Sequence, residues 1–448
     1  MTTDTVLRRT EFDSGLRVIT EAMRSVRSVT LGFWVQAGSR DEHDRIAGSS
    51  HFLEHLLFKG TGTRSARDIA EAFDAVGGDF NAFTAKETTC FYVRILDRDV
   101  PMAVDILCDM FRDAALRRSE FEAERQVILE EINMHEDTPD DLVHDLFSET
   151  LWAGHPLGRP VLGTVQSITG VSRDQVRRFY RRHYVPANLV IAAAGNLDHD
   201  RLVARLRRGM DVGRVVRSSR RGSAWSLRAA GAAPRPSGAR LVRPRKTEQA
   251  HIVIGTNGLA RSDPDRFTFN VVNAALGGGM SSRLFQEVRE KRGLAYSVFS
   301  YHTMFAEVGL FAMYAGTTPA RAPEVVELMR FEADRMAEGG LSGEELDRAK
   351  GHLKGSLVLS LEETSGRMSR LGRSEIGHGE ILTVDQILER VDAVTEEDTR
   401  RVAAKVLGRP SSMTVLGPVD ERAFGGSDPV AEAAVAAHHG DGAGAGLR

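Results

Sequence analysis

The chain has 448 residues, of which 59 are basic and 62 acidic, so its formal net charge at pH 7 is −3. A single hydrophobic core stops growing well below this length, so we expect two or more domains. The near balance of charge argues against general affinity for nucleic acid or for an anionic membrane surface. Cys90 and Cys108 fall in a strand pattern and a helix pattern without the spacing of a zinc site, so we expect buried, reduced thiols.

No segment has the composition of a targeting or membrane-spanning element. The stretch from Met1 to Ser14 carries two arginines but lacks the apolar core of a signal peptide, and no later run approaches the length of a membrane span. We therefore expect a soluble, cytoplasmic protein with no membrane partner.

The first elements in chain order are two strands and a helix with a polar stripe. Leu16 to Thr20 and Val29 to Ala37 are apolar and β-branched, as strands are. The next segment contains H-x-x-E-H, the inverted zincin signature. On a helix, His51 and His55 lie about 40° off a common face, so both imidazoles can reach one metal ion, and Glu54 shares that face. The alternative is a chance pentapeptide with ordinary core histidines.

Two further elements precede the next informative helix. Residues 65–76 predict a helix that ends at a glycine pair. Residues 79–85 and 88–95 then predict the two strands of a hairpin, the second by its β-branched and aromatic composition.

The segment from Ser119 to Glu136 predicts a helix that opens with a capping box. Glu124 and Glu131 fall on a stripe whose positions are normally apolar, and buried carboxylates need a cation or a hydrogen-bond donor. Glu130 is turned about 100° off that stripe and is interpreted as a solvated charge. We therefore choose Glu131 as the third metal ligand.

The spacing of these residues resembles the pitrilysin or M16 metallopeptidase family, and its smaller, mitochondrial-processing-peptidase-like M16B branch is the most similar. Glu131 follows His55 by 76 residues, and Glu124 precedes Glu131 by seven. The resemblance implies that His51, His55 and Glu131 ligate one Zn²⁺ ion. It also implies Glu54 as the general base and Glu124 as a supporting carboxylate, for which a purely structural hydrogen bond is the alternative.

The same resemblance gives the first strand of the hairpin a role. In that family the segment from Asn81 to Ala85 is an edge strand that receives extended substrate by main-chain pairing. Asn81, Ala82 and Phe83 are therefore expected to bind substrate. The residues alone indicate only a hairpin strand.

The second half of the chain repeats the first at an offset of 223 residues. Residues 395–399 echo 172–176, and 413–418 echo 190–195. This indicates duplication of a whole α+β domain. We expect two homologous α/β sandwich-like halves in tandem, each a mixed sheet covered by helices, in a clam-shell arrangement. The second half has no H-x-x-E-H, so one half alone carries metal.

Composition sets the expected boundaries. Residues 212–247 are rich in Arg, Pro and Gly, which predicts an exposed linker, and the end of the chain is rich in Ala, Gly and His, which predicts disorder. The expected parts are a zinc-bearing domain, the linker, a metal-free domain and a disordered tail, at residues 1–211, 212–247, 248–424 and 425–448.

One further stretch, from Gly277 to Tyr296, is informative. The glycine triplet ends one helix, and no Lys-Ser/Thr follows it as in a P-loop, so we reject nucleotide binding by this loop. By resemblance, Arg289 and Tyr296 match a pair that reaches from the metal-free half to the substrate. Tyr296 is expected to stabilise the oxyanion, and Arg289 to orient the peptide or that tyrosine. An ordinary helix-to-strand connection is the alternative.

These patterns predict a zinc metalloendopeptidase. Zinc lowers the pKa of a bound water to about 7, and Glu54 is expected to take its proton and to deliver a proton to the leaving amine. Family members with four such domains are about twice as long, so a closed chamber for peptides or unstructured segments needs a second subunit, most simply in a homodimer.

Two other interpretations stay open. A specific processor would remove leader sequences from one precursor, together with an inactive partner chain. A scaffold like the respiratory-complex core subunits that resemble this family would typically have lost the metal motif, which this chain retains. Cobalt and manganese also fit a His₂Glu site, although zinc is expected.

Overall fold

The protein is described by a computed structural model over residues 6–210, 215–216 and 231–439. Within this range the chain forms two compact units, each built around one sheet. Unit 1 comprises Met1–Glu131, Val161–Ala229 and Leu359–Ile381, and unit 2 comprises Ile132–Pro160, Ala230–Val358 and Leu382–Arg448. Among the described residues, no helix is long and apolar enough to cross a bilayer.

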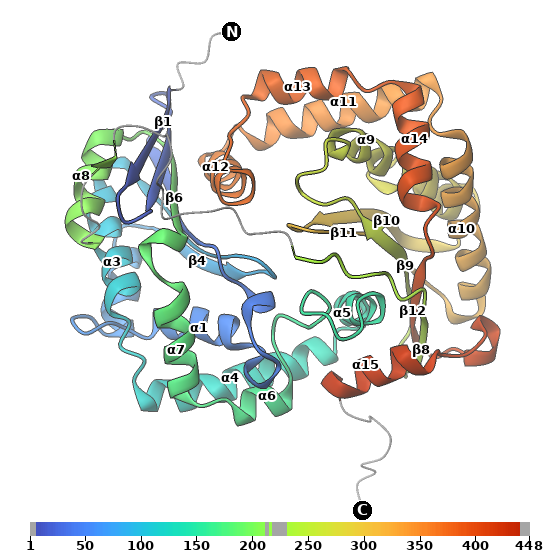
Figure 1. The fold of residues 1–448 in the computed structure, drawn as a ribbon, viewed down its shortest axis with the longest axis horizontal. Helices are drawn as coiled ribbons and strands as arrows, with labels where there is room; N and C mark the ends of the chain where they lie inside the picture. Colours follow the sequence, from blue (N-terminus) through green and yellow to red (C-terminus); the bar gives the residue numbers. More distant parts are fainter. Residues whose placement is uncertain (1–5, 211–214, 217–230, 440–448) are drawn as a thin grey trace, which may run out of the picture. The chain divides into compact units, whose positions relative to one another are not determined.

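Unit 1 holds a mixed seven-stranded sheet in the order β4-β5-β3-β6-β2-β1-β7 (Figure 1). Its strands are β1 Val6–Phe12, β2 Arg17–Ala22, β3 Ser28–Val35, β4 Asp79–Thr84, β5 Thr89–Leu96, β6 Leu189–Gly195 and β7 Val215–Val216. Among the described strands of this sheet, only β2 and β6 pair in parallel. The central strand β6 is buried along its whole length, which explains why its sequence is a continuous apolar run and does not alternate.

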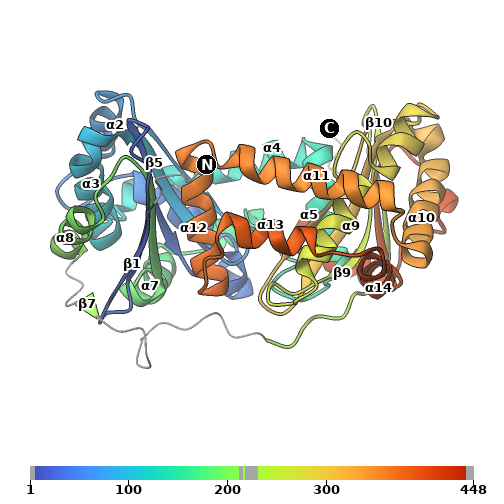
Figure 2. The same ribbon diagram turned by 90° about the horizontal axis from the view of Figure 1, so that it is seen from above.

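Helices cover both faces of this sheet. On one face lie α3 and α8, and on the other lies α12 (Figure 1, Figure 2). Side chains alternate along a strand, so Trp34 of β3 points to α12, where its indole Nε1 donates to Met368 Sδ at 3.3 Å. The helices that lie wholly or mainly in this unit are α1 Ser49–Phe58, α2 Ala66–Asp74, α3 Val100–Asp113, α4 Arg118–Glu136, α6 Val165–Gly170, α7 Arg173–His183, α8 His199–Met210 and α12 Thr364–His378.

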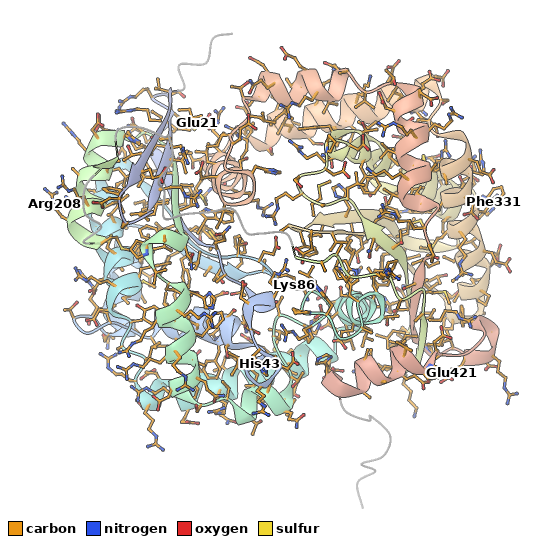
Figure 3. The ribbon with its side chains drawn as sticks, viewed as in Figure 1. Glu21, His43, Lys86, Arg208, Phe331 and Glu421 are labelled. Atoms are coloured by element: carbon orange, nitrogen blue, oxygen red, sulfur yellow. The ribbon has the colours of Figure 1, made fainter. Side chains whose placement is uncertain are left out.

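Buried polar contacts fasten α12 to the sheet. Arg17 Nη1 of β2 donates to Glu375 Oε1 at 2.7 Å, and both side chains are almost fully buried. Burial lowers the pKa of Arg17 to about 10, which leaves it charged at neutral pH. Arg370 also donates to Glu21 at 3.1 Å, and Glu21 is labelled in Figure 3. Because breaking a buried ion pair leaves an uncompensated charge, these contacts specify where α12 packs.

Unit 2 repeats the arrangement with a five-stranded sheet in the order β10-β11-β9-β12-β8. Its strands are β8 Arg240–Pro244, β9 Ala250–Gly258, β10 Ala295–Met304, β11 Gly309–Thr317 and β12 Ser412–Gly417. This order matches β4-β5-β3-β6-β2 of unit 1, and β12 and β8 pair in parallel as β6 and β2 do. The predicted class, two tandem mixed sheets covered by helices, is therefore confirmed.

Two hydrophobic clusters flank the sheet of unit 2. One contains side chains of α9, α10 and α14, and the other contains side chains of α5 and α15. Successive side chains of β9 point to opposite faces of the sheet, so Ile252 and Ile254 belong to the first cluster and Val253 belongs to the second. The helices of this unit are α5 Pro139–Leu151, α9 Arg266–Gly277, α10 Ala322–Gly339, α11 Gly343–Ser360, α13 Val384–Asp392, α14 Glu396–Leu407 and α15 Pro429–His439.

The expected boundaries differ from the observed ones in three ways. The expected linker, residues 212–247, contains β8, which pairs in parallel with β12. The expected disordered tail, residues 425–448, contains α15, whose buried residues Ala431 and Val435 join a cluster of the core. The compact units are also discontinuous in sequence, because α12 packs on the first sheet and α5 on the second. Cys90 and Cys108 are free and buried, as expected.

Candidate metal centre

The helix α1 carries the H-x-x-E-H residues, and a buried carboxylate anchors its start. Glu42 accepts hydrogen bonds from Gly48 N at 2.7 Å and from Ser50 N at 2.5 Å. Gly48 has a φ of +88°, and a Cβ there would lie 2.5 Å from Leu162 O, so only glycine fits this N-cap. The two bonds satisfy amides that the helix itself leaves without acceptors.

The chain that follows α1 is held by a second buried carboxylate. Asp109 of α3 accepts from Thr61 Oγ1 at 2.7 Å, from Thr63 Oγ1 at 2.8 Å and from the Arg64 guanidinium. The helix α1 is therefore held at its start by Glu42 and beyond its end by Asp109. The roles of Glu42 and Asp109 were not predicted from the sequence. For Asp109 a signal existed, because its neighbours in α3 are apolar and a carboxylate buried among them needs hydrogen-bond donors.

The expected metal ligands come together in unit 1. The ring centroids of His51 and His55 lie 4.6 Å apart. Glu131 Oε2 lies 3.7 Å from His51 Nε2 and 3.5 Å from His55 Nε2. Stacking of Phe52 on Phe121, with centroids 4.4 Å apart, joins the two helices that carry these ligands. Each of the three residues thus presents one donor atom toward a common point.

The carboxylate oxygen of this group has no other partner, as is expected of an atom that binds a metal ion. Glu131 Oε2 is buried, and no hydrogen-bond donor contacts it in the described part of the chain. A buried carboxylate oxygen in that state needs a cation. One ligand atom each from His51, His55 and Glu131 lies within 4.8 Å of the others, and among the residues that the structure describes no other group of His, Cys, Asp and Glu is placed in this way.

Burial keeps His51 in the form that coordinates a metal ion. Burial, with a smaller effect of the neighbouring His55, lowers the pKa of His51 to about 3. His51 is therefore neutral at pH 7, the form that binds a metal ion.

Glu124 lies where a supporting carboxylate was expected. Its Oε2 is 3.0 Å from His55 Nδ1, and its Oε1 is 2.7 Å from Lys59 Nζ. A carboxylate is an acceptor, so this contact assigns the proton of His55 to Nδ1 and leaves the Nε2 lone pair facing Glu131.

Glu54 stands beside the end of the edge strand. Thr84 Oγ1, at the end of β4, donates to Glu54 Oε2 at 2.5 Å. Burial raises the pKa of Glu54 above that of an exposed glutamate, the direction that favours a general base. The sequence offered no signal for Thr84, because this contact depends on the packing of α1 against β4.

The strand β4 that carries the expected substrate-binding residues is the last strand of its sheet. It pairs with β5 alone, and in the described residues its other edge faces no strand. Asn81 is exposed, whereas Ala82 and Phe83 are half-buried, and the Phe83 ring packs edge-on against Trp34 at 5.5 Å. Among the described residues this edge carries main-chain groups that pair with no strand, although Ala82 N donates to Asn81 Oδ1 at 2.8 Å.

Arg289 and Tyr296 lie together in unit 2. Arg289 belongs to a short π-helix, Phe285–Glu290, and Tyr296 to the edge strand β10. The guanidinium lies 4.5 Å from the centroid of the Tyr296 ring, and Arg289 Nη1 donates to Tyr296 O at 2.8 Å. Tyr296 is 77% exposed. The predicted reach of this pair toward the metal ligands of unit 1 stays a prediction.

Comparison with known proteins decides the family. The insulinase (peptidase family M16) profile matches residues 17–165, and the profile described as the peptidase M16 inactive domain matches residues 170–353. A Streptomyces coelicolor protein named an uncharacterized zinc protease is 50% identical over 424 residues, 93% of this chain and 90% of that protein. The chain belongs to peptidase family M16. It is thereby a metallopeptidase, as the sequence predicted.

Other M16 relatives agree with this placement. The uncharacterized zinc protease YmxG of Bacillus subtilis is 39% identical over 92% of this chain and 98% of its own. A solved structure of a protease from Helicobacter pylori superposes with a TM-score of 0.81 at 20% identity, over 92% of this chain and 99% of that one. A Pseudomonas fluorescens structure described as a peptidase M16 inactive domain gives 0.84 at 21% identity, over 95% and 99%. The two structures support the fold.

Glu42→Ala tests whether the anchor of α1 matters for stability. The substitution leaves two buried amides without acceptors, so we expect a loss of about 3 kcal/mol in the free energy of unfolding. Urea unfolding followed by fluorescence measures it. Glu71→Ala, which removes an exposed pair with Arg67, is the control and should change stability by less than about 0.5 kcal/mol. Equal effects of the two substitutions would contradict the anchoring role.

Proposed function

We propose that this chain is a zinc-dependent endopeptidase with one ion per chain, bound by His51, His55 and Glu131. The observation that carries the proposal is the convergence of two histidine Nε2 atoms on the unbonded, buried oxygen of Glu131. Three protein ligands of the His₂Glu type are typical of catalytic zinc sites. The zinc protease names of the relatives support the choice of metal.

The side chains around the ligands supply proton transfer. Zinc bound there would polarise the peptide carbonyl and lower the pKa of a water molecule. Glu54 accepts a proton from the attacking water and returns one to the leaving amine. Its carboxylate is oriented by Thr84 Oγ1, and burial raises its pKa, the direction that favours taking up a proton.

The edge of β4 explains which substrates are accepted. An extended peptide can add to this edge through main-chain hydrogen bonds at Asn81, Ala82 and Phe83, which recognises any sequence that is unfolded. The strand ends at Thr84, whose hydroxyl contacts Glu54, so a chain paired along β4 runs to the general base. We therefore propose oligopeptides and unstructured segments as substrates.

A pair of substrates with one sequence tests this selectivity. We expect cleavage of an unstructured quenched-fluorescent peptide, and no cleavage of the same sequence placed in a strand of a stably folded domain. Unfolding that domain by a destabilising substitution should restore cleavage at the same bond. Equal cleavage of the folded and unfolded forms would contradict recognition by strand addition.

We assign Tyr296 to stabilising the oxyanion and Arg289 to positioning it. The guanidinium holds Tyr296 from two sides, through its ring and through its main-chain carbonyl, so loss of Arg289 frees the tyrosine. A donor opposite the metal is what a tetrahedral intermediate requires.

Arg289→Ala is expected to keep the zinc content of the wild type and to lower kcat/KM about 100-fold, because the freed Tyr296 no longer acts as the oxyanion donor and loss of such a donor usually has an effect of this size. Steady-state kinetics with the fluorescent peptide measure it. Arg292→Ala is the matched control, because Arg292 Nη1 donates to the main-chain oxygen and to the carboxylate of Glu287, whereas Arg289 Nη1 donates to Tyr296. Unchanged kinetics of Arg289→Ala would remove unit 2 from the active site.

We further propose that the working enzyme is a homodimer, in which a second copy completes a closed chamber. Sedimentation equilibrium of the active protein at micromolar concentration should give twice the chain mass of 49.1 kDa. An active form that requires a co-purifying homologue without H-x-x-E-H would instead favour the narrower role in presequence processing.

A further inference from the structure

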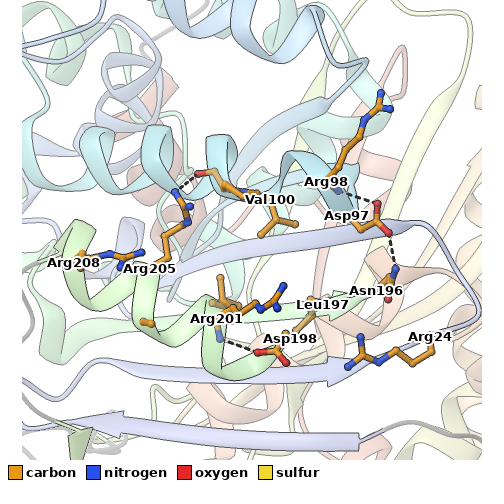
Figure 4. Close-up of a pocket in the computed structure, with 13 residues that line it drawn as sticks. Arg24, Asp97, Arg98, Val100, Asn196, Leu197, Asp198, Arg201, Arg205 and Arg208 are labelled. Atoms are coloured by element: carbon orange, nitrogen blue, oxygen red, sulfur yellow. Dashed lines mark hydrogen bonds between the residues drawn. The ribbon is translucent and has the colours of Figure 1, made fainter.

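A pocket of about 780 Å³ opens at one end of the sheet of unit 1 (Figure 4). Its walls come from the chain after β2, from the β5–α3 and β6–α8 connections, and from the first turns of α3 and one face of α8. Five arginines line it: Arg24, Arg98, Arg201, Arg205 and Arg208. The proposed catalytic mechanism uses none of them.

The pocket concentrates positive charge on a chain whose net charge is −3. Five arginines face two aspartates, which gives the lining a net charge of +3. Both aspartates are already engaged. Asp97 accepts from Asn196 Nδ2 at 2.6 Å and from Arg27 Nε at 3.0 Å, and Asp198 caps α8 by accepting from Arg201 N at 2.9 Å. Neither aspartate contacts a guanidinium of the lining.

Three of the arginines have no carboxylate to neutralise them. Arg24, Arg201 and Arg208 are exposed, and within the described ranges none of them forms an ion pair. Arg208 lies on the outer side of α8 in Figure 3. Arg201, Arg205 and Arg208 follow the i, i+4, i+7 spacing of one helix face, so they form a row about 10 Å long.

Apolar side chains complete the pocket beside this row. Leu197 and Leu202 are buried at its base, and Val100 and Pro101 form the wall from α3. A hollow with one apolar and one cationic wall accommodates a small amphiphilic anion better than a flat, fully solvated charged face does.

We propose that this pocket binds a small ligand that carries a chain of two or three phosphate groups. The guanidinium fork matches phosphate geometry and forms two parallel charge-assisted hydrogen bonds. A row of guanidinium groups suits successive phosphates, whereas the negative net charge of the chain disfavours an extended nucleic acid. Nucleoside polyphosphates and inorganic polyphosphate share this chemistry.

The pocket is separate from the candidate metal centre of the same unit. Thr89, at one end of β5, pairs with Thr84, which contacts Glu54. Leu96, at the other end, precedes Asp97 of the pocket, and the seven steps between Thr89 and Leu96 span about 23 Å. The ligand therefore does not touch the metal ligands, and its binding can be measured without reference to peptidase activity.

Calorimetric titration of the full chain with ATP and with inorganic tripolyphosphate tests the proposal, and the zinc content is checked afterwards because these anions chelate metals. We expect saturable binding of about one ligand per chain. The double substitution Arg201→Ala and Arg208→Ala should weaken it at least about tenfold. Arg207→Ala is the matched control, since Arg207 is an exposed arginine of the same helix outside the lining, and it should change the affinity by less than about twofold.

Equal affinities for the two probes would show that the phosphate chain is recognised, and tighter binding of ATP would show that the apolar wall contacts the nucleoside. Both results support the proposal. The proposal is overturned if neither ATP nor tripolyphosphate binds saturably at millimolar concentration, or if tetraglutamate binds as tightly as they do. It is also overturned if the double variant and the Arg207→Ala control lose the same amount of affinity. A single-stranded RNA that binds more tightly than either probe would also overturn it.

Discussion

Glu54→Gln is expected to keep about one zinc ion per chain while lowering peptide cleavage by at least about 1,000-fold, in the upper range for loss of a general base. The amide occupies the same space and still accepts from Thr84 Oγ1, but it cannot take a proton from water. Elemental analysis and single-turnover cleavage of an unstructured fluorescent peptide measure the two effects on one preparation.

Thr84→Val is the companion variant for this experiment. It removes the hydroxyl that orients Glu54 but leaves the carboxylate, so we expect full metal content and a loss of about tenfold in kcat. Loss of zinc together with activity in Glu54→Gln would mean that the ligand and the base have been confused.

Glu131→Gln is expected to weaken zinc binding by more than about 100-fold, because a neutral amide replaces the charged ligand. Substitution of residues that only support the ligands already costs about 10- to 100-fold. Competition against a chelating dye measures the affinity, and circular dichroism checks that α4 is retained.

The neighbouring carboxylate provides the control. Glu130 is exposed on the same helix and is turned about 100° from Glu131, so Glu130→Gln should bind zinc as the wild type does. Retained affinity in Glu131→Gln with loss in Glu130→Gln would contradict the ligand set.

Much of the candidate centre could be predicted because it lies on two helices. The 3.6-residue period alone places His51, Glu54 and His55 on one face of the first helix. The same period places Glu124 and Glu131 on one face of the second helix. The residues that hold this geometry could not be found in the same way. Glu42, Asp109 and Thr84 act across loops or from another helix and strand, so their contacts exist only once the chain has packed.

In the fold, too, some features could be predicted from the sequence and others depend on long-range packing. The internal repeat predicted two similar units, and the shared strand order of the two sheets confirms it. The place of α12 on the first sheet is set by long-range contacts such as Arg17 to Glu375, which were not predicted from the sequence. Likewise β8 and α15 lie in segments whose composition suggested a linker and a tail, but their apolar side chains are buried by partners distant in sequence.

The most direct test combines the zinc content of the purified protein with cleavage of an unstructured fluorescent peptide, before and after a chelator. We expect about one zinc ion per chain, loss of cleavage on chelation, and recovery when zinc is returned. A chain without bound metal, or cleavage that persists after the metal is removed, would contradict the metal centre built on His51, His55 and Glu131.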